Sequence, residues 1–305
     1  MKVAFLGNPE FSIPSLEALH QNHQITFIAT SPDRPACRGM KLQQPAVKIW
    51  GESHGIPVHQ VEKLDRSMES MFRNLDAGIV VASCFFVPGW LLKRPGFGFL
   101  NLHPSLLPKY RGPSPVAYAL LNSDKTTGVS IIKLSSKLDA GPILLQREVE
   151  ISPIEYRPVL EERLSRMGAK MLLETLDLFE TGKIQPREQD ESLATHAPLL
   201  IKEDGIIDFF RSAQQINDQI RALTPWPGCF TNYLGCPLKI TAARVHSSEK
   251  SPHQPGLVFS AQKENLLVAC GSGVLEILKL QMPSKKETEA WAFVCGYKIE
   301  GTVLG

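Results

Sequence analysis

Hydrophobic and polar positions follow two different periods along the first hundred residues. Short apolar runs of strand length alternate with stretches in which apolar residues recur at helical spacing. The runs predicted as strands are 1–6, 25–30, a short one around 58, 78–82 and 97–102, and the stretches predicted as helices are 11–20, 46–54 and 66–74. Such regular alternation of strand and helix predicts a mostly parallel, doubly wound α/β sheet of the Rossmann-like kind.

The pattern changes twice in the rest of the chain. A helix is predicted over 114–121, strands over 129–134 and 143–151, and a long amphipathic helix over 155–179. Residues 183–208 lose the periodicity and contain two prolines, which indicates a linker. After it come a helix at 213–223 and short alternating strands at 238–245, 256–260, 266–270 and 274–280. Short strands at this spacing predict a small C-terminal β-barrel, OB-like in size.

Charge and cysteine usage narrow the class of protein. The net charge of +2 gives no whole-chain argument for nucleic-acid binding. Locally, however, residues 77–123 contain four Lys and Arg residues and no acidic residue, which predicts a positive field that attracts anionic ligands. The six cysteines show neither a Cys-x-x-Cys pair nor zinc-ligand spacing, so no metal is expected. With no signal peptide and no run of membrane-spanning length, we expect a reduced, cytoplasmic protein without a membrane partner.

Polar side chains with chemical potential stand at the ends of the apolar strands. Asn101 and His103 are two residues apart at the end of the strand 97–102, so they point to the same side. This is the carboxyl edge, where open α/β sheets bind ligands. Asp139 precedes Gly141 in the turn between two later strands. Each residue alone could equally be a loop cap, a structural histidine or a turn residue, but their convergence on one edge favours a functional site.

An amide, an imidazole and a carboxylate suit acyl-type transfer without a covalent intermediate. No Gly-x-Ser-x-Gly nucleophile elbow is present, and no cysteine has a setting typical of a nucleophile. When an amine attacks a carbonyl, Asn and His donors can stabilise the oxyanion, each worth about 3 kcal/mol. The carboxylate can accept the proton of the amine directly, through water, or by setting the charge of the histidine. A nicotinamide cofactor is not expected, because Gly-x-Gly-x-x-Gly is absent.

The motifs around these residues resemble those of the folate-dependent formyltransferases. The shared pattern is Asn101-x-His103-x-Ser105-Leu106-Leu107-Pro108, then Arg111-Gly112, then Leu138-Asp139-x-Gly141, and the resemblance spans nearly the whole chain. It implies 10-formyltetrahydrofolate as co-substrate, with Asn101, His103 and Asp139 as the catalytic residues. It also implies a folate site made by three segments: Val81, Ala82, Ser83, Cys84, Phe85, Phe86, Val87 and Pro88; Ser105, Leu106, Leu107 and Pro108; and Ser135, Ser136, Lys137 and Leu138.

A basic loop bears on the acceptor of the formyl group. The loop 31–42, with Arg34, Arg38 and Lys41, resembles the one with which some members of the family engage the acceptor arm of initiator methionyl-tRNA. Those members also have a C-terminal barrel entered by Pro-Trp-Pro, as at 225–227 here. The resemblance therefore implies a catalytic domain at 1–182, a linker at 183–208 and a tRNA-binding barrel at 209–305. Taken by itself, the loop could also be solvated surface.

The chain departs from the family pattern at a few positions. Ser83-Cys84 stands where Tyr-Gly is common, Pro142 stands where an Asp is common, and the stretch 197–200 lacks a usual lysine. Some of these variants resemble sugar-nucleotide formyltransferases, which share the catalytic residues but acylate a 4-amino sugar. Those enzymes generally lack the basic loop, so they are the second interpretation. A non-enzymatic RNA-binding protein would leave Asn101, His103 and Asp139 unexplained.

Overall fold

The computed structural model describes residues 1–35, 42–262 and 265–305, and the chain divides into two compact units. The first unit consists of 1–115, 126–150 and 161–197, and the second of 116–125, 151–160 and 198–305. Each unit is described separately below. The predicted limits of the catalytic domain, linker and barrel stay a prediction.

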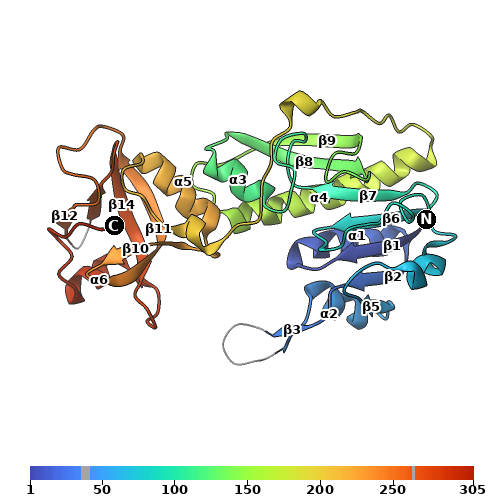
Figure 1. Ribbon diagram of the computed structural model, residues 1–305, viewed down its shortest axis with the longest axis horizontal. Coiled ribbons are helices and arrows are strands. Elements are labelled where there is room, and N and C mark those ends of the chain that lie inside the picture. Colours follow the sequence, from blue (N-terminus) through green and yellow to red (C-terminus); the bar gives the residue numbers. More distant parts are fainter. Residues whose placement is uncertain (36–41, 263–264) are drawn as a thin grey trace. The chain divides into compact units, whose positions relative to one another are not determined.

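The first unit is built on a seven-stranded sheet. Its strand order is β5-β2-β1-β6-β7-β8-β9, which can be followed in Figure 1. The strands are β1 (Lys2–Gly7), β2 (Gln24–Thr30), β5 (Val58–Gln60), β6 (Ala77–Val81), β7 (Phe99–His103), β8 (Thr126–Lys133) and β9 (Ile143–Glu150). Neighbouring strands from β5 to β7 run parallel, and β8 and β9 are antiparallel. The predicted mostly parallel α/β sheet is therefore confirmed.

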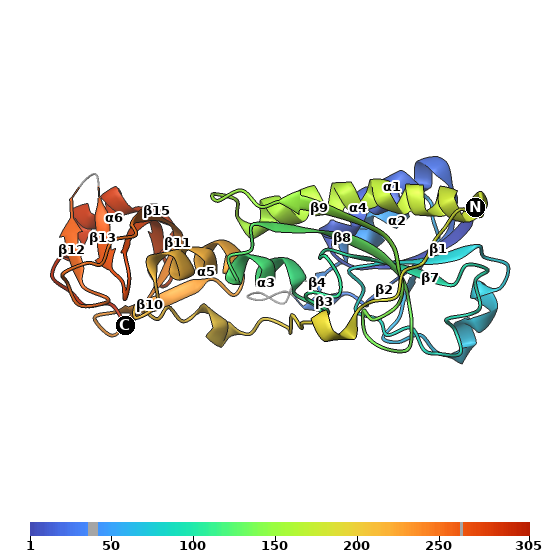
Figure 2. The same ribbon diagram turned by 90° about the horizontal axis from the view of Figure 1, so that it is seen from above.

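Helices and short pieces surround this sheet. They are η1 (Glu10–Ser12), α1 (Ile13–Asn22), the strand pair β3 (Arg34–Pro35) and β4 (Leu42–Gln43), α2 (Ala46–Ser53), η2 (Arg66–Phe72), α4 (Arg157–Glu180, whose first turn counts with the second unit) and η3 (Glu191–Leu193). Figure 2 shows α1 and α4 on the same side of the sheet. Ser165 of α4 donates a side-chain hydrogen bond of 2.6 Å to the carbonyl of Phe11, which fixes α4 beside the start of α1.

The two faces of the sheet separate by the period of two that strands impose. Leu102 in β7 faces α4, where a side chain in place of Gly168 would collide with it. The opposite face carries a buried cluster that includes Leu6, Val80 and Phe99. In the parallel register Val80 lies opposite Asn101, so Asn101, and with it His103, belongs to the face that carries this cluster. The strand pattern thus sets both polar residues on the side away from α4.

The second unit is an antiparallel, strand-rich domain with helices. It contains α3 (Pro115–Leu121), η4 (Lys202–Gly205), α5 (Ala213–Leu223), β10 (Cys229–Tyr233), β11 (Cys236–Ser247), β12 (Val258–Ala261), β13 (Leu266–Ala269), β14 (Val274–Gln281), β15 (Thr288–Glu289) and α6 (Ala290–Gly296). The strand order is β10-β11-β14-β13-β12, with β15 beside β14. This agrees with the predicted strand-rich C-terminal domain.

A buried ion pair explains why two excursions of the chain belong to the second unit. Asp218 and Arg221 of α5 pair with each other at almost no exposure. Ser123 donates to the Asp218 carboxylate at 2.5 Å, and Arg221 donates to the carbonyls of Ser152 and Glu155 at 3.2 and 2.9 Å. Because buried charges need partners, these bonds hold residues 116–125 and 151–160 to α5.

Several local predictions differ from the structure. The stretch 66–74, predicted as a helix, forms a 3₁₀ helix over Arg66–Phe72. The strand β10 and helix α6 had no prediction. β10 forms a hairpin with β11 through Leu234 and Gly235, both with positive φ (50° and 81°). Leu-Gly is not among the dipeptides that signal such a turn, so the sequence concealed this strand.

Candidate active site

Asn101 and His103 lie buried at the end of β7, in the interior of the larger sheet. They are 8% and 4% exposed, and Asp139 is 7% exposed. We call Asn101, His103 and Asp139 the trio. Ionisable and amide side chains seldom lie so deep without partners, so their contacts with one another decide what the site can do.

Asp139 comes from the turn between β8 and β9 and reaches the other two side chains. Its Oδ1 accepts from Asn101 Nδ2 at 3.4 Å, and its Oδ2 lies 3.6 Å from His103 Nδ1. Oδ2 also accepts from the main-chain amide of Gly112 at 2.8 Å. The backbone of Asp139 has φ of 47°, the left-handed region that residues with a side chain seldom adopt. The three residues predicted from sequence are therefore brought together.

The imidazole of His103 has one nitrogen occupied and one directed at the carboxylate. Nε2 lies 2.8 Å from the carbonyl oxygen of Tyr110, and a carbonyl only accepts, so Nε2 carries a hydrogen. Nδ1 is the nitrogen that faces Asp139. With Nε2 bound to the main chain, Nδ1 is the position at which His103 can act on a reactant.

Hydrogen bonds from side chains of β8 and β9 fix the loop 104–112 that follows β7. Ser130 in β8 accepts from the amide of Leu107 at 3.1 Å and donates to the carbonyl of Ser105 at 2.7 Å. Gln146 in β9 donates to the carbonyl of Leu107 at 2.9 Å, and the Leu107–Pro108 bond is cis. Of the residues predicted for folate here, Ser105 and Leu107 are buried in this scaffold, and Leu106 and Pro108 are half-buried.

The segment 81–88 after β6 alternates between core and surface. Val81, Phe85 and Val87 are buried, the last two in the cluster on the face of the trio, whereas Phe86 is 67% exposed. Ala82 is exposed with φ of 45°, Ser83 and Pro88 are half-buried, and the exposed Cys84 accepts from Asn8 Nδ2 at 3.3 Å. Of the three large apolar residues that the segment contributes to the expected folate site, Phe85, Phe86 and Val87, only Phe86 has an exposed side chain.

The third segment predicted for folate, 135–138, directly precedes Asp139. Ser135 is half-buried, and Ser136, Lys137 and Leu138 are exposed, with Leu138 at 65%. Lys137 N donates to Ser135 Oγ at 3.3 Å, so the turn is closed on itself. An apolar side chain exposed beside a buried carboxylate is available for an apolar ligand.

Of the three residues predicted to bind tRNA, the structure describes one. Arg34 is exposed in β3, whereas Arg38 and Lys41 lie outside the described residues. Next to Arg34, Asp33 accepts from Lys48 at 2.9 Å and from Gln60 at 2.6 Å. These hydrogen bonds, that of Lys48 first, hold the pKa of the Asp33 carboxyl below its ordinary value.

One residue that sequence reasoning did not connect to the site contacts it directly, and Arg111 contacts that residue. Gln189 donates from Nε2 to the carbonyl of Asp139 at 2.7 Å, and it accepts from Arg111. Arg111 was part of the family motif without an assigned contact, and Gln189 lay in the predicted linker. A polar residue in an aperiodic stretch gives no sequence signal of such a contact.

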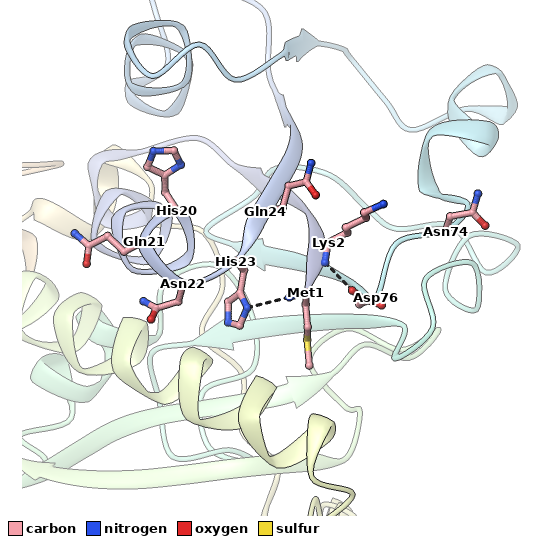
Figure 3. Close-up of a pocket in the computed structure, with 9 residues that line it drawn as sticks. All are labelled: Met1, Lys2, His20, Gln21, Asn22, His23, Gln24, Asn74 and Asp76. Carbon is pink, nitrogen blue, oxygen red and sulfur yellow. Dashed lines mark hydrogen bonds between the residues drawn. The ribbon is translucent and has the colours of Figure 1, made fainter.

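An open hollow lies at the other end of the sheet. It has a volume of about 750 Å³ and is lined at the amino ends of β1, β2 and β6 by residues that include His23, Asn74 and Asp76. Figure 3 shows His23 directed at the amino group of Met1 (3.3 Å) and Asp76 at the amide of Lys2 (2.6 Å). His23 and Asp76 are thus engaged with the first two residues of the chain rather than with each other.

Three further observations concern the thiols of two cysteines, the groups that could bind a metal ion, and the helices that could span a membrane. Burial raises the pKa of the Cys229 thiol to about 12 and that of Cys270 to about 11, so neither is a thiolate near neutral pH. Within 1–35, 42–262 and 265–305, no group of three or more His, Cys, Asp or Glu side chains is placed to hold a metal ion. Of the helices in that same part of the chain, none has both the length and the apolarity needed to cross a membrane.

Two family models match the chain. Residues 1–176 match the one described as formyl transferase, and residues 199–298 match the one described as formyl transferase, C-terminal domain. Proteins named methionyl-tRNA formyltransferase are similar over their full length. That of Citrifermentans bemidjiense is 39% identical, covering 100% of this chain and 96% of the relative. That of Roseiflexus castenholzii is 42% identical, covering 99% and 97%.

Solved structures share the fold at lower identity. WlaRD, a sugar 3N-formyl transferase crystallised with dTDP and 5-N-formyl-THF, has a TM-score of 0.71 at 14% identity, covering 94% of this chain and 99% of that one. HypX from Aquifex aeolicus, solved in complex with tetrahydrofolic acid, has a TM-score of 0.65 at 18% identity. The match covers 97% of this chain but 47% of HypX. At these identities the likeness concerns the fold alone.

Proposed function

The chain belongs to the formyl transferase family, and we propose that it transfers the formyl group of 10-formyltetrahydrofolate to the amino group of initiator methionyl-tRNA. The product would be N-formylmethionyl-tRNA, used for translation initiation in the cytoplasm. The observation that carries the proposal is the convergence of the trio at the carboxyl edge of the sheet. Support for the acceptor comes from relatives of that name that match both units at about 39% identity.

The trio supplies the groups that this reaction needs. The amine attacks the formyl carbon, and the carbonyl oxygen becomes an oxyanion. The amide of Asn101 donates to it, and His103 donates from Nδ1 in its doubly protonated form, because Nε2–H already binds the carbonyl of Tyr110. The hydrogen bond from Asn101 Nδ2 to Asp139 is long, at 3.4 Å, and therefore weak. The Asn101 amide can exchange it for a shorter hydrogen bond to the oxyanion. One such donor contributes about 3 kcal/mol to the transition state, because it is already oriented in a buried site.

The proton has a defined route. The attacking amine loses a proton, which Asp139 accepts directly or through water. His103 lies beside the Asp139 carboxylate. When the carbon–nitrogen bond to the folate breaks, N10 of the folate takes up one proton. The formyl group thus moves from one nitrogen to the other and one proton moves the opposite way, so the reaction balances without a metal or an oxidant.

The chain offers apolar side chains that suit a folate and basic side chains that suit a tRNA. For the folate we propose the three segments 81–88, 105–108 and 135–138, where exposed Phe86 and Leu138 offer apolar contact and the main chain offers hydrogen bonds. For the tRNA we propose Arg34, Arg38 and Lys41 of the basic loop and the barrel domain 209–305. The catalytic domain would be 1–182, joined by the linker 183–208.

The direct test offers the protein two acceptors. The parent protein is incubated with 10-formyltetrahydrofolate and either methionyl-tRNA or a 4-amino-sugar nucleotide, and the acceptor that gains a formyl mass is identified. We expect formylated methionyl-tRNA and an unchanged sugar nucleotide. The reverse result would make the chain a sugar formyltransferase, and no product with either acceptor would refute both.

A further inference from the structure

The segment 187–197, which we call the bridging segment, ties the loop that follows β7 to the turn that carries Asp139. At its start, Arg187 exchanges two main-chain hydrogen bonds with Ile143, just after the turn of Asp139, at 2.7 and 2.8 Å. Near its end it makes two main-chain bonds of 2.8 Å with Arg111 in the loop after β7. The segment therefore fixes the spacing between the turn and the loop.

One side chain of the bridging segment reaches the trio itself. Gln189 donates both amide hydrogens, to the carbonyls of Asp139 and Gly141, each at 2.7 Å. Its Oε1 accepts from Arg111 Nη2 at 2.8 Å and Nε at 3.1 Å. Because carbonyls only accept and a guanidinium only donates, the amide has a single orientation that satisfies all four bonds. A glutamate or an apolar residue could not make both donations.

Arg111 makes this orientation firm. Its side chain is 6% exposed, and a guanidinium at that depth needs compensating partners. Glu191 supplies them with both carboxylate oxygens at 3.0 Å, and this bond to Arg111 holds the pKa of the Glu191 carboxyl below its ordinary value. Contacts therefore run without interruption from Glu191 through Arg111 and Gln189 to the turn of Asp139.

Asp139 is held through both its side chain and its main chain. Its carboxylate accepts from the amide of Gly112, and its carbonyl accepts from Gln189. A non-glycine residue with φ of 47° is disfavoured, so the surrounding contacts must maintain the conformation. The hydrogen bond from Gln189 fixes the direction of the Asp139 carbonyl, and that direction is set by the backbone conformation of the same residue.

We propose that Gln189 is a positioning residue that holds Asp139 against His103 and Asn101. The inference rests on the proposed function, since it assigns Asp139 a part in formyl transfer. Gln189 need not touch either substrate for this role. A displacement of about 1 Å at a reacting group can cost about 10²-fold in rate, so loss of the two donations lowers kcat while substrate binding is kept.

The experiment uses three variants of the full chain. Gln189→Glu keeps the size and the acceptor for Arg111 but places a carboxylate oxygen against two carbonyls. Gln189→Met removes donors and acceptor alike without a new charge, so it keeps the test valid if Gln189→Glu does not fold. Glu188→Gln is the matched control, because it changes the same pair of residue types at the neighbouring, exposed position.

Two quantities are measured for each variant. The first is the split between kcat and KM for methionyl-tRNA formylation. The second is the amide resonance of Gly112 in the ¹H–¹⁵N spectrum, which reports the Asp139 carboxylate that it donates to. Asp139→Asn supplies the reference position of this resonance when the charge is lost.

We expect both Gln189 variants to lose about 10- to 100-fold in kcat with little change in either KM, and to shift the Gly112 resonance. Glu188→Gln should match the parent in both. Parental kcat and a parental Gly112 resonance in a folded Gln189 variant would overturn the proposal, as would a loss of activity that only follows the loss of folded protein. If the parent itself does not formylate methionyl-tRNA, the proposed function fails, and the Gly112 resonance alone decides whether Gln189 positions Asp139.

Discussion

The larger sheet carries the same three residue types at both ends of its strands, and the two sets differ in arrangement. We call the two places the carboxyl edge and the amino edge. At the carboxyl edge the trio is nearly buried, and its side chains face one another within 3.4 to 3.6 Å. At the amino edge Asn74, His23 and Asp76 line an open hollow of about 750 Å³, and Asp76 and His23 contact main-chain groups of the first two residues. Residue type and open volume therefore do not identify the site. Mutual approach of buried polar atoms does.

The largest expected effect separates the two aspartates. Asp139→Asn keeps the shape of the side chain and removes the proposed proton acceptor, so we expect kcat to fall by about 10²-fold or more, the usual contribution of acid–base catalysis. Asp76→Asn at the hollow should leave kcat at the parental level. The measurement is the pH–rate profile of each variant. If the profile of Asp139→Asn agrees with the parent's in height and midpoints, Asp139 is structural.

The asparagines give the next comparison. Asn101→Ala removes one proposed donor to the oxyanion, and we expect kcat to fall by about 10²- to 10³-fold with a modest change in KM. Asn74→Ala is the control at the amino edge, where the residue has φ of 64°, so it should lower stability and not kcat. Steady-state kinetics beside thermal unfolding distinguish these effects. Near-normal kcat in Asn101→Ala would remove Asn101 from the mechanism.

A smaller effect concerns the acceptor rather than the chemistry. Loss of a phosphate contact in Arg38→Ala should raise KM for methionyl-tRNA and make the salt dependence of binding shallower by about one unit. Folate binding should be unchanged. Lys170→Ala, an exposed change on α4, is the control for general charge effects. Equal KM and equal salt slopes in parent and Arg38→Ala would leave the loop as solvated surface.

The smallest effect is expected at the hollow and concerns stability alone. Burial, followed by the amino group of Met1, lowers the pKa of His23 below its ordinary value of 6.5, although Glu180, Asp177 and Asp76 act in the opposite direction. As the pH falls below about 6.5, the unfolded chain therefore takes up this proton before the folded one, and stability decreases. His23→Gln should lose less stability than the parent between about pH 7.5 and pH 5, as seen in Tm. A parallel loss in both proteins would show that His23 contributes nothing to the pH dependence.

Much of the site could be predicted from sequence because its information is local. The period of two puts Asn101 and His103 on one side, the strand end puts them at the ligand-binding edge, and the turn before Gly141 brings Asp139 to the same edge. The parallel sheet followed from the alternation of apolar runs with helical stretches. These signals lie within a few residues of the positions they describe.

The remainder depended on contacts between distant parts of the chain. Gln189 meets the carbonyl of Asp139 fifty residues away, and Arg111 meets Glu191 eighty residues away. The aperiodic composition of 183–208 predicted a linker, yet Gln189 and Glu191 make specific hydrogen bonds. Similarly, Phe85 and Val87 belong to a segment expected to bind folate, and the burial of their side chains in the core had no signal in the sequence. Periodicity cannot reveal which apolar residue of a loop is covered by another segment.

Two histidines, one at each edge of the sheet, allow a direct test of where formyl transfer takes place. Single-turnover formation of N-formylmethionyl-tRNA is measured at saturating 10-formyltetrahydrofolate and methionyl-tRNA for the parent, His103→Ala and His23→Ala. We expect product from the parent, the same rate from His23→Ala, and a rate lower by about 10²-fold or more from His103→Ala. A parental rate from folded His103→Ala would contradict the assignment of the carboxyl edge as the site of formyl transfer.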